Sequence, residues 1–119
     1  MKRVVQRNSS DCGIACVAML AGVTYEIAAA TIFGTQRPSY TTGIELREAL
    51  QTLRRRPAKR FIAFNGRLHT SLCEPALLKV NPRMGGDGWH WVVWSGKTIL
   101  DPKHPPYVRL RPVSYLTLQ

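Results

Sequence analysis

An unbroken apolar pattern near the start of the chain predicts a buried first helix. Residues 12–21 carry apolar side chains at helical spacing, and a run of polar, helix-capping residues comes directly before them. Gly22 is placed to end this helix. The stripe on its buried side is formed by Ile14, Val17, Ala18 and Ala21.

Two further helices are predicted before the middle of the chain. Thr24 is an N-cap residue for a short, alanine-rich helix that reaches about residue 31 and is closed by Gly34. Thr42 and Glu45 have the spacing of a capping box, which predicts a third helix from there to about Arg55. Its buried side is expected to carry Ile44, Leu46, Ala49, Leu50 and Leu53.

From residue 60 the pattern changes to short β-prone runs separated by turn residues. The expected strands cover residues 60–64, 76–80, 108–110 and 113–118, together with two runs that flank Ser95-Gly96. Helices come first and strands later, with no alternation of the two. This order indicates an α+β fold in one domain over residues 1–119, with the N-terminal helices packed on an antiparallel sheet.

The hairpin around Ser95-Gly96 brings a histidine close to an aspartate. If these two residues form the loop, His90 faces Asp101 directly, with Cβ atoms about 5 Å apart. A carboxylate in that place holds the imidazole in one tautomer and favours its protonated form. A turn at Gly96-Lys97 would pair Val92 with Asp101 instead, so the geometry depends on the register.

Cys12 has the surroundings of a nucleophile. It lies in the first turn of the predicted first helix, where backbone N–H groups and the positive end of the helix dipole favour a thiolate. Gln6 lies six residues upstream, where a loop can return its side-chain amide to the sulfur as an oxyanion donor. A thiolate also needs a base, and His90 is the candidate.

The remaining cysteines carry no such signal. Cys16 and Cys73 are expected to be ordinary core residues. A zinc site made from the three cysteines and a histidine is conceivable, but the sequence lacks a close-spaced ligand pair of the usual kind. We therefore expect neither a metal nor a cofactor.

Composition narrows the classes of partner. The chain has 119 residues, of which 45% are hydrophobic, and its apolar runs are too short to cross a bilayer. The absence of an apolar signal-peptide centre and the odd number of cysteines favour the cytoplasm. A net charge of +10 indicates attraction to acidic partners. The densest basic run, residues 54–60, fits a solvated helix end better than a nucleic-acid patch, because few aromatic residues accompany it.

Five short motifs resemble, in order along the chain, the bacteriocin-processing cysteine peptidases, which are papain-like domains that cut leader peptides after a double glycine. The first and most specific motif is Gln6-x5-Cys12, extended as Asp11-Cys12-Gly13-x-Ala15-Cys16-x-x-Met19. The others are Thr41-Thr42-Gly43-x-x-Leu46-x-x-Ala49-Leu50, Pro75-Ala76-Leu77-Leu78, His90-Trp91-Val92-Val93 and Asp101-Pro102.

The resemblance implies a papain-like peptidase with four catalytic residues. Cys12 would be the nucleophile, His90 the general base and acid, Asp101 the orienting carboxylate and Gln6 the oxyanion donor. Further candidates for contact with a peptide or protein substrate are Asp11, Gly13, Gly88, Trp89 and Trp91.

Two other classes of function stay open at this stage. One is a different acyl-transfer enzyme on the same scaffold, such as an isopeptidase or deamidase that modifies a protein partner. The other is a basic module that binds nucleic acid or an acidic protein without chemistry.

Overall fold

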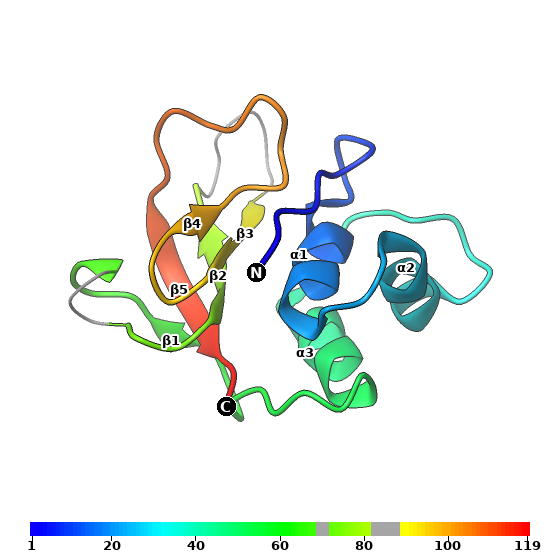
Figure 1. The fold of residues 1–119 in the computed structure, drawn as a ribbon, viewed down its shortest axis with the longest axis horizontal. Helices are drawn as coiled ribbons and strands as arrows, with labels where there is room; N and C mark the ends of the chain where they lie inside the picture. Colours follow the sequence, from blue (N-terminus) through cyan, green and yellow to red (C-terminus); the bar gives the residue numbers. More distant parts are fainter. Residues whose placement is uncertain (69–71, 82–88) are drawn as a thin grey trace.

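The computed structural model of the chain describes residues 1–68, 72–81 and 89–119. In these residues, three helices lie on one side of a five-stranded antiparallel sheet (Figure 1), which confirms the predicted α+β class. The helices are α1 (Cys12–Ala21), α2 (Tyr25–Phe33) and α3 (Gly43–Thr52). The strands are β1 (Ile62–Ala63), β2 (Ala76–Val80), β3 (His90–Trp94), β4 (Ile99–Leu100) and β5 (Pro112–Thr117).

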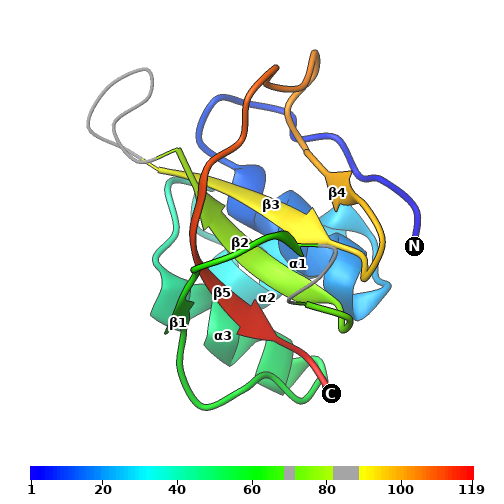
Figure 2. The same ribbon diagram turned by 90° about the vertical axis from the view of Figure 1, so that its left-hand side faces the viewer.

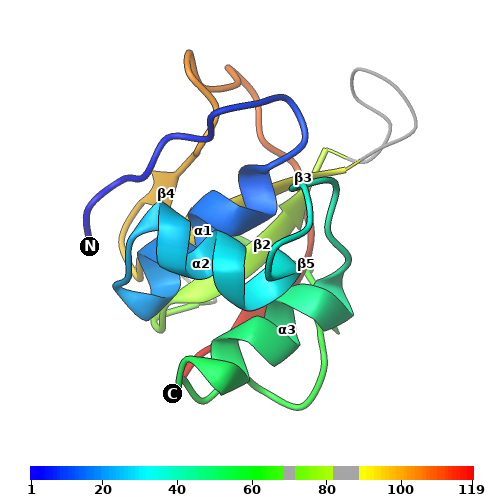
Figure 3. The same cartoon turned by 90° about the vertical axis from the view of Figure 1, so that its right-hand side faces the viewer.

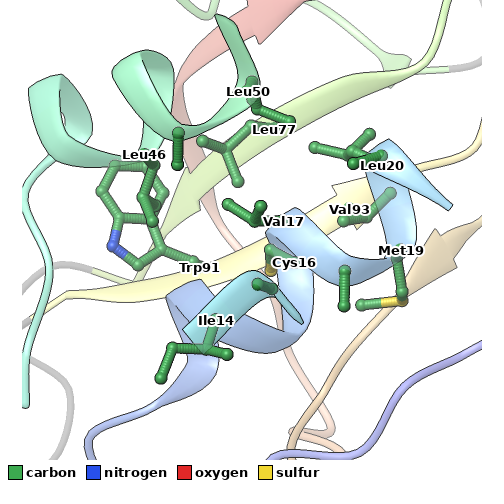
Figure 4. Packing of buried hydrophobic residues seen from close by; sticks show 14 of the residues in the cluster. Ile14, Cys16, Val17, Met19, Leu20, Leu46, Leu50, Leu77, Trp91 and Val93 are labelled. Atoms are coloured by element: carbon green, nitrogen blue, oxygen red, sulfur yellow. The ribbon is translucent and has the colours of Figure 1, made fainter. Parts of the chain in front are cut away.

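Helix α1 lies at the centre of the molecule. All ten of its residues are buried, because α2 and α3 cover it on one side and β2 and β3 on the other (Figure 3). Its side chains interdigitate with Leu46, Leu50, Leu77, Trp91 and Val93 (Figure 4). A helix that is apolar on every side is stable only in such a setting. Gly22 ends α1 in the left-handed conformation, as predicted, with φ +69°.

Local capping signals set the starts of α2 and α3. The Thr24 hydroxyl accepts a hydrogen bond from the backbone N–H of Ile27 at 3.1 Å. Thr42 and Glu45 form the predicted capping box, with both reciprocal hydrogen bonds present. Helix α2 continues two residues beyond the expected end, whereas α3 stops at Thr52, three residues earlier than expected.

The prediction that Ile44 lies on the buried side of α3 is wrong, since this residue is 71% exposed. The buried residues of α3 are Leu46, Ala49 and Leu50, which share one face. Two positions along a helix are about 200° apart, so Ile44 points away from the face that Leu46 buries.

The strands follow the order β1-β5-β2-β3-β4, and every pairing is antiparallel (Figure 2). Side chains alternate between two apolar clusters. Leu77, Trp91, Val93 and Leu116 join the helices, while Leu78, Val80, Val92 and Trp94 form a second cluster with Leu72. Trp91 and Trp94 therefore point to opposite faces, as the strand period requires.

Two expected strands differ from those observed. Residues 60–64 contribute only the two-residue strand β1, and residues 108–110 form no strand. Val108 is fully exposed, and the backbone carbonyl of Arg109 accepts a hydrogen bond from the Asn81 side chain at 2.9 Å. The Asn81 side chain thus occupies a backbone carbonyl that would accept a hydrogen bond from a neighbouring strand if residues 108–110 formed one.

The basic run from residue 54 to 60 was expected to lie at the end of α3, but its Arg55 binds the end of α1. The Arg55 guanidinium donates to the Ala21 carbonyl from Nε and Nη2, at 3.2 and 2.5 Å. Ala21 is the last residue of α1, whose carboxyl end carries the negative end of the helix dipole.

No single helix among the described residues has the length and apolar character to cross a bilayer. Helices α1 and α2 have that length and apolar character only when taken together, and they are bent by 115° relative to one another.

Candidate active site

The hairpin of β3 and β4 has the alternative register. Val93 pairs with Leu100, Trp94 pairs with Ile99, and the Ser95 N–H donates to the Thr98 carbonyl at 2.9 Å. The loop is therefore Gly96-Lys97, and the predicted Ser95-Gly96 loop is wrong. Gly96 has φ +100°, which suits the first central position of a type II′ turn. The Ser95 hydroxyl also accepts the N–H groups of residues 97 and 98.

His90 and Asp101 nevertheless meet. Nε2 of the imidazole lies 2.6 Å from Oδ1 of the carboxylate, and the residues are 8% and 5% exposed. In the observed register Asp101 follows Leu100 and comes level with Val92, so His90 is its diagonal neighbour. Diagonal positions in a sheet are about 7–8 Å apart, a distance that a long side chain spans. The predicted contact is present, although the two residues do not face each other directly.

Electrostatics keep His90 protonated near neutral pH. Burial by itself lowers the pKa of His90, but the hydrogen bond and charge of Asp101, together with the nearby Cys12 side chain, outweigh it and raise the pKa to about 9. For Asp101 the effects have the opposite signs. Burial tends to raise the pKa of this carboxyl group, but the hydrogen bonds from His90 and from two backbone N–H groups lower it below its ordinary value. The two residues therefore form a buried ion pair.

The segment after β4 wraps around the Asp101 carboxylate. Oδ1 accepts the N–H of Lys103 at 2.9 Å, and Oδ2 accepts the N–H of Tyr107 at 3.0 Å. The Tyr107 ring also lies edge-on to the imidazole, with centroids 5.0 Å apart. Both oxygens of the carboxylate are thus held, which fixes its orientation toward His90.

Cys12 is the first residue of α1 and completes the group. Its side chain lies close enough to the imidazole to add to the rise in the His90 pKa. Because Nε2 is engaged by Asp101, Nδ1 is the nitrogen left for the sulfur. The thiol is 5% exposed. Cys12 at the start of α1 therefore lies beside His90 and Asp101, which belong to the distant β3–β4 hairpin and the residue that follows it.

Asp11 is the last of the helix-capping residues that precede α1, but its side chain makes no capping hydrogen bond with the helix. Its carboxylate is fully buried and turns back to the preceding loop. It accepts the backbone N–H groups of Arg7 and Asn8, both at 2.9 Å, and the Tyr25 hydroxyl at 2.5 Å. Burial and this hydrogen bond raise the pKa of Tyr25. Asp11 therefore shapes the loop that joins Gln6 to Cys12.

Gln6 comes to the site through its backbone. Its N–H donates to the carbonyl of Pro102, the residue after Asp101, at 2.8 Å. The side-chain amide donates from Nε2 to the Asn8 carbonyl at 2.7 Å. Its buried Oε1 accepts no hydrogen bond from any described residue, so the amide is anchored at one end only.

The other substrate-contact candidates divide by burial. Trp89 is 36% exposed and lies under the Lys79 ammonium, whereas Trp91 is 3% exposed and donates its indole N–H to the Thr41 carbonyl. A Cβ atom on Gly13 would stand 2.1 Å from the Thr41 hydroxyl, so this glycine gives the residue-41 segment room against α1. Gly88 lies outside the described residues.

The two other cysteines differ from each other. Cys16 is fully buried one turn below Cys12, and burial raises its thiol pKa well above the ordinary value. Cys73 is exposed, so its assignment to the core is wrong. Among residues 1–68, 72–81 and 89–119, no three His, Cys, Asp or Glu side chains are grouped closely enough to hold a metal ion.

Some residues at the site carry no signal in the sequence. Arg3, Tyr25, Thr41 and Tyr107 contact the candidate residues across separations of up to about a hundred positions, and no motif or periodicity predicts these contacts. Of these, Tyr25 follows a predicted cap and Thr41 belongs to a quoted motif, but neither pattern indicates a contact with the site.

Neither the protein-family models nor the curated proteins give a match for this sequence. Its function is therefore inferred from the geometry of the site.

Proposed function

We propose that this chain is a papain-like cysteine peptidase whose nucleophile is Cys12. One observation carries the proposal: the buried His90 imidazole is hydrogen-bonded to the Asp101 carboxylate and lies beside the Cys12 side chain, which helps to raise its pKa. A thiol at a helix start, beside an imidazolium that a carboxylate orients, is the arrangement expected of an activated nucleophile.

The proposed reaction is acyl transfer. The Cys12 thiolate attacks the carbonyl carbon of a peptide bond, and a C–S bond forms. The imidazolium of His90 then gives its proton to the leaving amine as the C–N bond breaks. Neutral His90 next takes a proton from water, which attacks the thioester. The C–S bond then breaks, the carboxylic acid leaves, and the Cys12 thiolate and the His90 imidazolium are restored. Asp101 supports both forms of the imidazole by fixing its orientation.

Two donors are available for the oxyanion. The backbone N–H of Cys12 belongs to the first turn of α1, whose N–H groups have no partner within the helix. The Gln6 amide is the second donor, and it reaches the substrate by giving up its hydrogen bond to Asn8. Because its Oε1 accepts no hydrogen bond from the described residues, this reorientation breaks only one interaction.

The proposed substrate is a peptide or a protein segment, cut after a small residue such as glycine. The excess of 17 basic over 7 acidic residues favours substrates with acidic character. An isopeptidase or deamidase would use the same residues, and a substrate panel that includes Gly-Gly peptides and protein tails ending in glycine separates these activities.

Alkylation is the first test, because it needs no known substrate. Cys73 is exposed and reacts in any case, so the protein is studied as Cys73→Ser. With iodoacetamide, Cys12 is expected to react selectively and with a rate that follows the titration of His90, while buried Cys16 reacts only after unfolding. His90→Ala should slow the labelling of Cys12. If Cys12 stays unlabelled in the folded protein, or if His90→Ala leaves its rate unchanged, the peptidase proposal fails in favour of a binding module.

The oxyanion role is tested separately by Gln6→Ala. Removal of one oxyanion donor lowers kcat by about a hundredfold or more. The alkylation rate of Cys12 should change little, because alkylation forms no oxyanion. Equal turnover of a peptide substrate by Gln6→Ala and wild type would remove Gln6 from the mechanism.

A further inference from the structure

The N-terminal segment is hydrogen-bonded to three consecutive residues that begin with Asp101. The carbonyls of residues 101 and 103 accept hydrogen bonds from Arg3, and the carbonyl of residue 102 accepts the N–H of Gln6. The segment lies along the chain that follows β4 (Figure 3). The donors and acceptors are about a hundred positions apart in the sequence.

Arg3 makes the two outer contacts with one guanidinium. Nε lies 2.6 Å from the carbonyl oxygen of Asp101, and Nη2 lies 2.5 Å from that of Lys103. A guanidinium holds its N–H groups in a rigid planar fork, so two simultaneous hydrogen bonds fix the separation and direction of both carbonyls. A lysine ammonium has no such fork and cannot impose this geometry.

The turn that Arg3 holds also sets the Asp101 carboxylate. Oδ1, the oxygen that contacts His90, accepts the N–H of Lys103 as well. This N–H shares its peptide unit with the Pro102 carbonyl, which the Gln6 N–H holds, and the two carbonyls that Arg3 holds belong to the peptide units on either side. A shift of the turn would move Oδ1 relative to Nε2, and the 2.6 Å contact tolerates little movement.

We propose that Arg3 is a positioning residue that acts on His90 through Asp101, and that residues 3–6 join the oxyanion donor Gln6 and the carboxylate into one rigid unit. Arg3 contacts neither the thiol nor the imidazole, and its effect passes through the backbone of residues 101–103. The catalytic consequence rests on the proposed peptidase function, whereas the effect on the imidazole does not.

The test compares Arg3→Ala, Arg3→Lys and a control, Lys2→Ala. Lys2 lies in the same segment, is exposed and loses the same charge, and it makes no hydrogen bond with a described residue. Titration of the His90 ring is followed by NMR in the free protein. Among the described residues, the charged or titratable groups beside the His90 ring are Asp101 and Cys12, and the Tyr107 phenol lies edge-on to it.

Both Arg3 variants should lower the pKa of His90 from about 9 toward 6.5, because the carboxylate is less well held, and Lys2→Ala should leave it unchanged. Millimolar guanidinium should restore the wild-type value in Arg3→Ala but not in Arg3→Lys, whose side chain fills the site. With a peptide substrate, kcat should fall about tenfold to a hundredfold with little change in KM.

An unchanged His90 titration in folded Arg3→Lys overturns the proposal, whatever the activity. If Arg3→Ala fails to fold, Arg3→Lys keeps the comparison, since it retains the charge and the aliphatic stem. A lowered His90 pKa in a protein that cleaves no peptide supports the positioning role and counts against the peptidase function alone.

Discussion

Asp101→Asn offers the sharpest test of the electrostatics at the site. The substitution removes the negative charge beside His90 and leaves one side-chain oxygen. This oxygen can accept the backbone N–H of Lys103 or that of Tyr107 but not both, because the two groups reach different oxygens of the carboxylate. Without the carboxylate, burial dominates, and burial lowers the pKa of His90. The pKa should therefore fall from about 9 to 6.5 or below.

The size of the effect follows from linkage. Each pKa unit is worth about 1.4 kcal/mol, so a rise from 6.5 to about 9 on folding stabilises the protein by about 3 kcal/mol. A group whose pKa is raised in the folded state gives its full stability below the unfolded value. This stability is present below pH 6.5 and is lost as the pH rises through about 9.

Urea unfolding at pH 6 and at pH 9.5 measures this loss. We expect the free energy of unfolding of the wild type to fall across this range and that of Asp101→Asn to change much less. NMR titration assigns the pKa directly, because His90→Gln identifies which of the three histidines is observed. Glu74→Gln is the matched control, because it removes an exposed negative charge far from His90. Glu74 precedes the first residue of β2, whereas His90 pairs with Val80, the last residue of that strand.

Two results would refute this reasoning. One is a His90 ring that titrates near 6.5 in the wild-type protein, which would mean that burial and the ion pair cancel. The other is a titration that Asp101→Asn leaves in place, which would show that a different group holds the proton on the imidazole.

Three further predictions concern stability and are read by thermal or urea unfolding. Asp11→Ala leaves two backbone N–H groups and the Tyr25 hydroxyl without their buried acceptor and should cost about 2–4 kcal/mol, whereas Tyr25→Phe removes one donor and should cost about 1 kcal/mol; equal losses would contradict the role of Asp11 as an organising acceptor. Gly13→Ala places a methyl group 2.1 Å from the Thr41 hydroxyl and should cost about 1–3 kcal/mol, and an unchanged melting temperature would show that the segment yields freely. Thr42→Ala breaks the capping box of α3 and should cost about 1 kcal/mol, with Thr42→Ser as the control that retains the hydroxyl.

The sequence predicts best where the structure depends on neighbouring residues. Gly22 ends α1, and Thr24 and Thr42 begin the next two helices, because caps act within one turn. The register of the hairpin was predicted wrongly, since Ser95-Gly96 and Gly96-Lys97 are both acceptable two-residue loops. The choice between them falls to a glycine with φ +100° and to the packing of both strands.

Only the reactive residues of the candidate site could be predicted from the sequence. Cys12, His90 and Asp101 carry recognisable chemistry, so a pattern can single them out. The groups that hold them do not, because Arg3 acts on a backbone carbonyl 98 positions away and any residue supplies a carbonyl. Residue type in the sequence tells which groups can react, whereas the placement of their supports depends on the closed fold.

The burial of every residue of α1 limits how this protein can be altered. Since the helix has no solvent-facing side, it offers no position for a spectroscopic probe or an affinity handle, and the sulfur at its start is fixed relative to the whole interior. If the site acts on peptides as proposed, adjustment to different substrates falls to the loops around it. Efforts to redirect selectivity should vary those loops and leave the helix untouched.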